Sequence, residues 1–208
     1  MKHAKKAAFF LCSQILLICL SPVQLVTTAY QRLILKDNIA IITLKQAYAI
    51  VLTTVDEFVH KTYPGDITFE STIHQITPDI KARIKEQADV TLDENLDAAF
   101  HFRVIQKSGN IIGYVVEDYV RGKWDPIHYA LAITPEGAVK SVAILEYREK
   151  RGKPVAKTRF LKQFRGKTIT DSIEVMKDIK GITGASISSN GVTNGIRKLL
   201  HLFQEFYS

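Results

Sequence analysis

The chain has 208 residues, of which 46% are hydrophobic and 24% are charged, and its formal net charge is +7. This length suits one ordinary domain with a buried core, and the apolar content excludes an intrinsically disordered chain. The densest basic cluster, at residues 148–153, has no interleaved aromatic residues. A solvated loop is therefore favoured over a nucleic-acid surface, and no nucleic-acid partner is expected.

Residues 1–29 have the pattern of a signal peptide. Three lysines precede an apolar stretch from Ala7 to Leu20, and small residues at 27–29 suit cleavage after Ala29. An uncleaved anchor is the alternative, but the stretch has only about fourteen residues, where a membrane span needs about twenty. We therefore expect the chain to be exported and to act in the periplasm or elsewhere outside the cytoplasm, with a membrane-associated partner.

Both cysteines, Cys12 and Cys19, lie in this predicted signal peptide. The exported chain would then contain no cysteine, which excludes disulfides, iron–sulfur clusters, thiolate zinc sites and a cysteine nucleophile. The histidines show no metal-ligand spacing, so no metal site is expected. Redox chemistry would need an electron carrier of another kind.

The region from residue 30 to residue 97 is predicted to be helical. Thr43 and Gln46 have capping-box spacing, and the apolar residues that follow have helical periodicity, which predicts an amphipathic helix over 44–60. Thr77 and Pro78 predict the start of a second, shorter helix, with Thr77 as its N-cap.

Residues 98–208 are predicted to form the functional domain. Alternating and β-branched segments at 100–106, 111–116, 129–134 and 139–147 are joined by short turns, which favours an antiparallel sheet of about four or more strands. Short helices are expected at 158–164 and 170–177, and a long amphipathic helix at 189–206. This order of helices, sheet and helices predicts a single α+β domain, with N-terminal and C-terminal helices packed on the sheet.

The segment with the clearest chemistry is Thr183-Gly184-Ala185-Ser186-Ile187-Ser188-Ser189, directly before the last helix. Its small residues permit close approach of a ligand, and its hydroxyls surround the start of a helix, where free N–H groups and the helix dipole favour a phosphate. Two other interpretations are open. Ser188 or Ser189 is an ordinary N-cap of the helix, or Ser186 is the nucleophile of a hydrolase, although no G-x-S-x-G elbow is present.

This segment resembles the attachment loop of the FMN-binding domain family, which includes the flavin subunits of the sodium-pumping quinone reductase and of Rnf complexes. The family's loop reads Ser/Thr-Gly-Ala-Thr/Ser, followed by a Ser/Thr pair and a helix. Upstream, Gly113-Tyr114, the stretch 144–147 and the F-x-x-Q-F-x-G-K element at 160–167 resemble the family's order of elements. The resemblance covers roughly residues 98–200, and the ordered set of motifs makes the match fairly specific.

The resemblance implies FMN as cofactor, with a phosphoester to Ser186 that an FAD-dependent FMN transferase installs during maturation. It also implies electron transfer with a membrane or periplasmic redox partner, as a component of an oxidoreductase system and with no catalytic residue of its own. Two departures from the family's pattern weaken the prediction of covalent attachment. Lys180 stands where the family often has an acidic residue, and Ser186 stands where Thr is commoner. The alternative is a secreted binding or scaffold module that holds flavin non-covalently, with Lys180 attracting its phosphate, or not at all.

Four further residues are weaker candidates for flavin contacts. Trp124 and Tyr147 are candidates for stacking on the flavin ring, although each is more often a core or surface aromatic residue. Glu146 and Gln163 are candidates for contacts with the flavin edge or with the loop, and both are equally compatible with a structural role.

Overall fold

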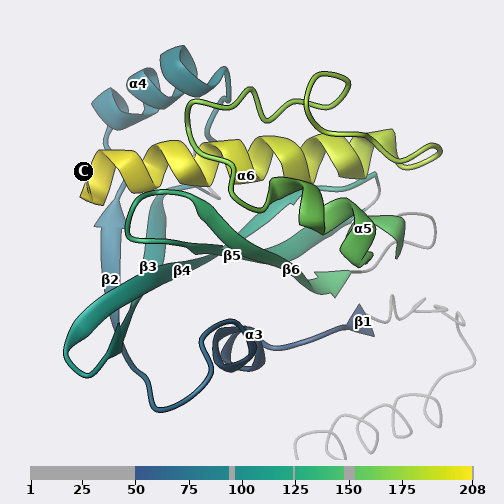
Figure 1. The fold of residues 1–208 in the computed structure, drawn as a ribbon. Coiled ribbons are helices and arrows are strands. Elements are labelled where there is room, and N and C mark those ends of the chain that lie inside the picture. Colours follow the sequence, from purple (N-terminus) through teal and green to yellow (C-terminus); the bar gives the residue numbers. More distant parts are fainter. Residues whose placement is uncertain (1–49, 94–96, 124, 148–152, 208) are drawn as a thin grey trace, which may run out of the picture. The chain divides into compact units, whose positions relative to one another are not determined.

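The computed structural model describes residues 50–93, 97–123, 125–147 and 153–207 (Figure 1). The predicted signal peptide, Trp124 and most of the basic cluster at 148–153 lie outside these ranges. The first part of the helix predicted over 44–60 also lies outside them.

One antiparallel sheet forms the centre of residues 47–208, with strand order β1-β6-β5-β4-β3-β2. The strands are β1 (Ile50–Val51), β2 (Thr68–Gln75), β3 (Ala99–Lys107), β4 (Asn110–Arg121), β5 (Pro126–Ile133) and β6 (Val139–Tyr147). From β2 to β6 each strand pairs with the next strand along the chain, because short connections join antiparallel neighbours. The predicted antiparallel sheet and α+β class are confirmed.

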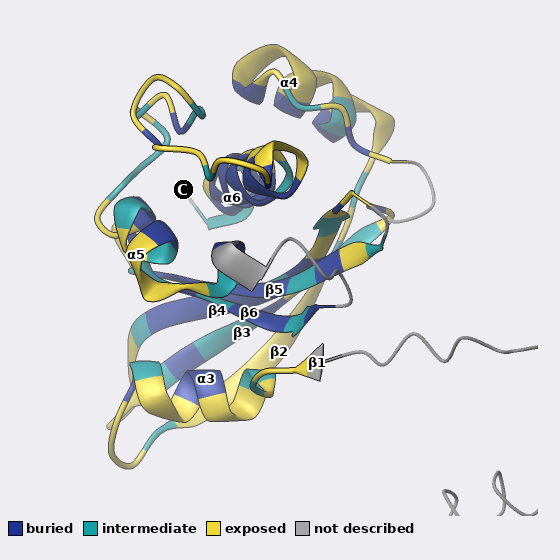
Figure 2. Ribbon diagram, turned by 90° about the vertical axis from the view of Figure 1, so that its right-hand side faces the viewer, coloured by how far each residue is buried: buried dark blue, intermediate teal, exposed yellow. Residues whose placement is uncertain are grey.

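The helices cover the two faces of the sheet unequally. The helices α4 (Pro78–Ala88) and α6 (Ser186–Tyr207) lie on one face, and α3 (Val55–Thr62) lies on the other (Figure 1). A short helical segment lies beside α6, next to β6; it consists of η1 (Lys153–Ala156), α5 (Thr158–Leu161) and η2 (Lys162–Phe164). Figure 2 shows the deepest burial along α6 and the strands that it covers, with α4 on the outer side of α6.

The main core lies between α6 and the sheet. The apolar stripe predicted on the last helix is buried, and its members Val192, Ile196, Leu199, Leu200 and Phe203 are at most 2% exposed. Since each fully buried large apolar side chain contributes about 1.5–3 kcal/mol, this stripe fixes α6 on the sheet. The first turn of α6 is therefore held at one end of the sheet.

A second, smaller core lies under α3. Thr54 caps this helix through a capping box with Glu57, and Phe58 and Val59 pack on the sheet. The helix predicted over 44–60 is confirmed at 55–60 and is wrong at 50–54, because residues 50–51 form β1 and the helix begins only at Val55. The apolar residues just before the helix are exposed, so their pattern reflects an edge strand.

An ion cluster is buried where the middle of α6 meets the sheet. Lys198 Nζ lies 2.7 Å from Asp97 Oδ1 and 3.0 Å from Asp118 Oδ2, and Tyr129 Oη donates a 2.9 Å hydrogen bond to Asp118. The three charged residues are at most 7% exposed. Burial raises the pKa of the Asp118 carboxyl, while the Lys198 ammonium opposes that rise.

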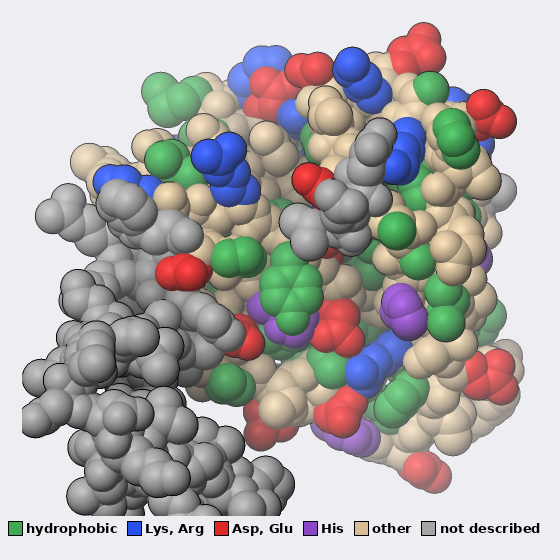
Figure 3. All heavy atoms as spheres, turned by 180° about the vertical axis from the view of Figure 1, so that it is seen from behind, with side chains coloured by type: hydrophobic (Ala, Val, Ile, Leu, Met, Phe, Trp, Pro, Cys, Tyr) green, Lys and Arg blue, Asp and Glu red, His purple; other side chains and the backbone are tan. Residues whose placement is uncertain are grey.

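The exposed face seen from behind differs from this buried cluster in how its charges are arranged. Figure 3, the view from behind, shows acidic, basic and histidine side chains intermixed with hydrophobic ones. Charges of both signs that alternate in this way are typical of an ordinary solvated surface.

Two further features differ from the sequence predictions. The edge strand β2 was not predicted, since nearly all its residues are exposed and give no buried alternation. The helix predicted over 170–177 is absent: this segment forms turns with an isolated bridge between Val175 and Ile179, and Ile173 and Met176 have positive φ angles. By contrast, the helices predicted from Thr77-Pro78 and over 158–164 are confirmed, the second as α5 followed by η2.

Candidate functional site

A tight turn leads the chain into α6. Ala185 N donates a 3.0 Å hydrogen bond to Ile182 O, which closes a four-residue β-turn. Gly184 is the third residue of this turn and has φ +80°, the left-handed conformation that a type II turn requires at that position. A side chain at 184 would meet no atom within 4 Å, so the glycine is needed for its backbone angle and not for space.

The helix α6 begins at Ser186, three residues earlier than predicted. The first hydrogen bond along the helix runs from Ser189 N to Ala185 O, at 2.9 Å. Ala185 precedes the first helical residue, and its methyl side chain has no oxygen with which to cap the helix. The backbone N–H groups of Ser186 and Ile187 therefore have no hydrogen-bond partner among the described residues, which suits an anionic ligand.

The hydroxyls of the segment divide into two classes. Thr183 and Ser186 are exposed, whereas Ser188 and Ser189 are 2% and 0% exposed. Ser189 Oγ donates to Ala185 O at 2.9 Å and accepts from Ile182 N at 3.2 Å, so it ties the helix to the turn. Ser189 thus has a structural role, and Ser186 presents its hydroxyl at the first turn of the helix.

Gln163 holds the chain just before the turn. Its side-chain oxygen accepts a 2.8 Å hydrogen bond from Lys180 N, and its amide nitrogen donates to Lys180 O at 3.2 Å. The same nitrogen also donates to Phe160 O at 3.3 Å. One side chain therefore pairs with both backbone groups of Lys180, which fixes the path of the loop while the Lys180 side chain stays exposed.

Polar side chains also stabilise residues 166–179, which contain no helix. Asp178 accepts hydrogen bonds from Ile173 N, Glu174 N and Lys167 Nζ, the last at 2.7 Å. Burial alone would raise the pKa of the Asp178 carboxyl, but these donors lower it to about 2. Arg197 of α6 donates from Nη1 to two carbonyl oxygens at 172 and 173, so the loop is attached to the helix.

A pocket of about 650 Å³ adjoins the loop, a size typical of small-molecule sites. Its lining joins α5 and η2 to the start of the turn and consists of Lys157, Arg159, Phe160, Gln163, Lys180, Gly181 and Ile182. Three of these side chains are cationic and none is acidic. Two of the predicted site residues, Gln163 and Lys180, are thus brought together beside the turn that carries Ser186.

The remaining predicted contacts do not line this pocket or lie outside the described residues. Glu146 is half-buried on β6, and Tyr147 next to it is 1% exposed in the main core. Trp124 lies outside the described residues, so its stacking role stays a prediction. Within the described residues, no group of three or more His, Cys, Asp or Glu side chains is placed to hold a metal ion.

None of the helices in the described part of the chain is long and apolar enough to cross a membrane.

Sequence reasoning missed most of the residues that build the loop. Lys167 and Asp178 meet across the loop, and Arg197 reaches the loop only because α6 packs beside it. The F-x-x-Q-F-x-G-K resemblance was the signal that named Gln163, and contact with the loop was one of the two roles predicted for this residue. The contact of Gln163 with Lys180 spans 17 positions and follows from the fold.

Two comparisons with known proteins found a similar domain and a similar protein. Residues 122–201 match the profile of the FMN-binding domain, and this range contains β5, β6, the loop and most of α6. One component of the proton-translocating ferredoxin:NAD(+) oxidoreductase complex of Clostridium ljungdahlii is 32% identical over 109 residues. That alignment covers 49% of this chain and 58% of the relative, so the chain spans little more than half of the relative's length.

Proposed function

We propose that this chain is an extracytoplasmic electron-transfer flavoprotein with FMN attached to Ser186, because residues 122–201 match the FMN-binding domain, whose cofactor is FMN. The observation that carries the proposal is the exposed Ser186 hydroxyl at the first turn of α6. Ser188 and Ser189 are buried, which leaves Thr183 as the other exposed hydroxyl of the segment.

The residues around Ser186 fit the phosphate of FMN. The N–H groups of Ser186 and Ile187 and the positive end of the helix dipole favour an anion at this position. The cationic side chains of Lys157, Arg159 and Lys180 line the adjoining pocket and add to the attraction. Lys180, which replaces the acid that the family often has at this place, thus favours phosphate binding by its charge.

Attachment is a phosphoryl transfer without oxidation or reduction. A bond forms between Ser186 Oγ and the FMN-side phosphorus of FAD, the pyrophosphate bond of FAD breaks, AMP leaves and the hydroxyl proton passes to water. An FAD-dependent FMN transferase supplies the catalytic groups for this step during maturation. The chain's own contribution is the pre-formed turn, in which Gln163 and Ser189 fix the backbone just before Ser186.

The chemistry that FMN supplies when bound is the transfer of one or two electrons. Residues of the chain bind and orient it, and the carrier exchanges electrons with a membrane or periplasmic redox partner. The relative in the clostridial complex supports a partner in a membrane oxidoreductase. The signal-peptide pattern of residues 1–29 supports a site of action outside the cytoplasm.

Co-expression of the chain with an FAD-dependent FMN transferase tests the proposal. The wild type is expected to fluoresce as a single band on a denaturing gel, and Ser186→Ala to lose that band. Thr183→Ala removes the other exposed hydroxyl and serves as the matched control, with its fluorescence retained.

Two outcomes would change the account. A yellow wild type that releases all its flavin on denaturation would replace the phosphoester by non-covalent binding. A colourless wild type would overturn flavin binding in favour of a secreted binding module of the same fold.

A further inference from the structure

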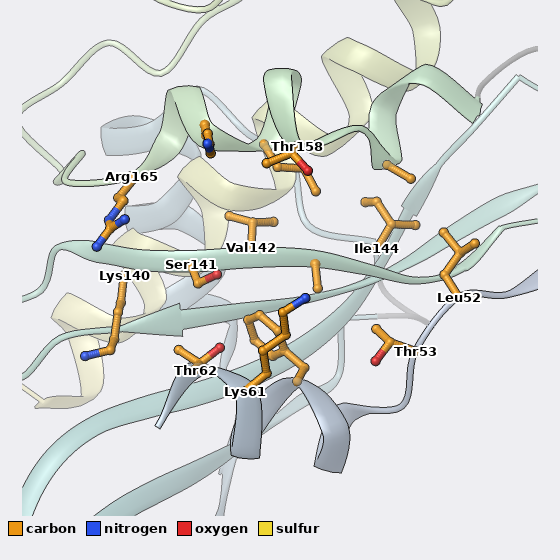
Figure 4. A pocket seen from close by; sticks show the side chains of 15 residues that line it. Leu52, Thr53, Lys61, Thr62, Lys140, Ser141, Val142, Ile144, Thr158 and Arg165 are labelled. Carbon is orange, nitrogen blue, oxygen red and sulfur yellow. The ribbon is translucent and has the colours of Figure 1, made fainter. Parts of the chain in front are cut away.

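A second pocket, of about 640 Å³, lies along the β6 edge of the sheet (Figure 4). Val142, Ala143 and Ile144 of β6 contribute to its lining. Side chains of α3 line one side, and side chains of α5 and η2 line the other. It shares no lining residue with the pocket beside the Ser186 loop.

The edge of β6 is paired at both ends of this groove. At one end Val139 N donates to Lys167 O and Val139 O accepts from Gly166 N, each at 2.8 Å. At the other end Leu145 O accepts from Leu52 N at 2.8 Å, where β1 adjoins β6. Beyond Leu52 the chain turns away from the edge into α3, so among the described residues no strand neighbours the part of β6 between these two ends.

The pairing of β6 with β5 decides which backbone groups are open on this edge. Thr134 N donates to Ala138 O at 2.8 Å where the two strands meet, and hydrogen-bonded pairs alternate along an antiparallel ladder. The register with β5 shifts by one residue just after Val139. Beyond this shift, Ser141 and Ala143 occupy the next hydrogen-bonded pairs with β5. The N–H and C=O groups of Ser141 and Ala143 therefore face β5.

Val142 and Ile144 alternate with these residues and direct their backbone groups outward. Their side chains pack in the same core as that of Val139, whose backbone also faces outward, which agrees with this alternation. No described residue forms a hydrogen bond with the outward groups of Val142 and Ile144. The backbone of β6 thus offers two donors and two acceptors in a row.

The groove is also strongly cationic. Four basic side chains and no acidic one line it: Lys61, Lys140, Lys162 and Arg165. Within the described residues, none of the four forms an ion pair with a carboxylate. Figure 4 shows Lys140 and Arg165 at one end of the groove and Leu52 at the other. Lys140 Nζ lies 4.8 Å from the centre of the Tyr63 ring, a cation–π contact that holds it at the groove.

We propose that this groove binds an extended acidic peptide segment of a partner protein, which adds a strand to the open edge of β6. Main-chain hydrogen bonds to Val142 and Ile144 provide affinity, and the four cations select acidic side chains. The open edge, from Lys140 to Ile144, spans about 17 Å at about 3.3 Å per residue. A small anion would use the cations but would leave the backbone of β6 unpaired.

The first experiment uses the full chain and two labelled octapeptides. In one peptide Glu and Val alternate, and in the other Lys replaces every Glu. Fluorescence anisotropy is expected to show that the Glu peptide binds at least about tenfold more tightly than the Lys peptide, as charge complementarity requires. Equal binding of the two peptides, or no binding of the Glu peptide, would overturn the proposal.

N-methylation of the Glu peptide tests strand addition without changing any charge. Alternate residues of a strand direct their N–H groups to opposite edges, so methylating every second residue blocks one edge and leaves the other free. Of the two peptides methylated in this way, the one blocked on the pairing edge is expected to bind about tenfold more weakly than the other. Equal binding of these two peptides would contradict strand addition and would assign the groove to anions alone.

A pair of charge variants tests the cations. Lys61→Glu reverses a charge in the groove and is expected to weaken binding of the Glu peptide about tenfold. Lys85→Glu makes the same change on the exposed surface of α4 and is expected to leave binding unchanged. Equal effects of the two variants would mean that the net charge of the chain, and not the groove, attracts the peptide.

Hydrogen exchange gives a readout that needs no variant. In the wild type, the amide protons of Val142 and Ile144 are expected to exchange more slowly when the Glu peptide is bound, while those of β2, on the opposite edge, are unchanged. Unchanged exchange at both positions in the saturated complex would contradict strand addition. Because the Ser186→Ala chain retains the groove, it should bind the peptide normally, which separates this inference from the proposed flavin site.

Discussion

The middle and the first turn of helix α6 use polar residues in opposite ways. In the middle, Lys198 is paired with two buried carboxylates. At the first turn, Ser189 binds the backbone of the preceding turn, and Ser186 stays exposed. This difference separates two kinds of polar residue. A polar residue whose hydrogen-bond and ion-pair partners all lie within the fold has a structural role. A binding site is found where a backbone that such contacts hold in place presents an accessible polar group.

The largest expected effect comes from the ion cluster. Lys198→Met removes the cation between Asp97 and Asp118 and leaves two buried carboxyls, so the free energy of unfolding is expected to fall by about 3–5 kcal/mol. Denaturant titration at pH 7 measures this change. Arg83→Met, which breaks the more exposed pair with Glu205, is the control and should have a much smaller effect. Equal losses in the two variants would contradict the distinction between buried and exposed pairs.

The next largest loss of stability is expected from a substitution in the turn before Ser186. Gly184→Ala forces a residue with a side chain to adopt φ +80°, which is expected to destabilise the chain by about 1–2 kcal/mol and to slow flavin attachment. Gly166→Ala is a matched control, since Gly166 has the same φ and equally open surroundings but lies outside the turn. It should lose similar stability and keep the wild-type rate of attachment. Similar slowing in both variants would mean that attachment responds to stability alone.

A smaller, pH-dependent effect is expected from Asp178. Its folded pKa of about 2 lies below the ordinary value of 3.8, so the charged form stabilises the loop above pH 3.8, and this contribution is lost as the pH falls through 2. Asp178→Asn should therefore lower the Tm at pH 7, and the difference from the wild type should shrink between pH 4 and pH 2. Asp66→Asn, at an exposed position, is the control. A Tm difference that does not change with pH would assign the loss to packing.

The regular parts of this fold are largely predictable from the sequence. The hairpins of β3 to β6 and the buried stripe of α6 follow from alternation and periodicity, because those residues bury one face. The edge strands β1 and β2 could not be predicted in the same way, since their side chains are largely exposed and show no buried alternation. Thr54 and Glu57 have the same capping-box spacing as Thr43 and Gln46, yet only the structure shows that a helix starts at the second pair.

The motif predicted the position of the candidate site, but not the contacts that hold the loop in place. A helix start was expected near Ser189 because serine is a common N-cap, whereas Ser189 directs its hydroxyl to the preceding turn. Ala185 occupies the cap position, which sequence preferences disfavour. Contact of Gln163 with the loop was one of its predicted roles, but its pairing with Lys180 and the contacts of Asp178 with the backbone depend on how the chain folds and were not predicted.

Tandem mass spectrometry of the loaded chain tests the central claim most directly. Trypsin releases residues 181–197 as one peptide, because Lys180 and Arg197 are its flanking basic residues. This peptide contains all four hydroxyls of the loop. We predict that it carries the mass of FMN less one water, and that fragmentation places the addition on Ser186. Placement on Thr183, Ser188 or Ser189, or an unmodified peptide from a yellow protein, would contradict the account.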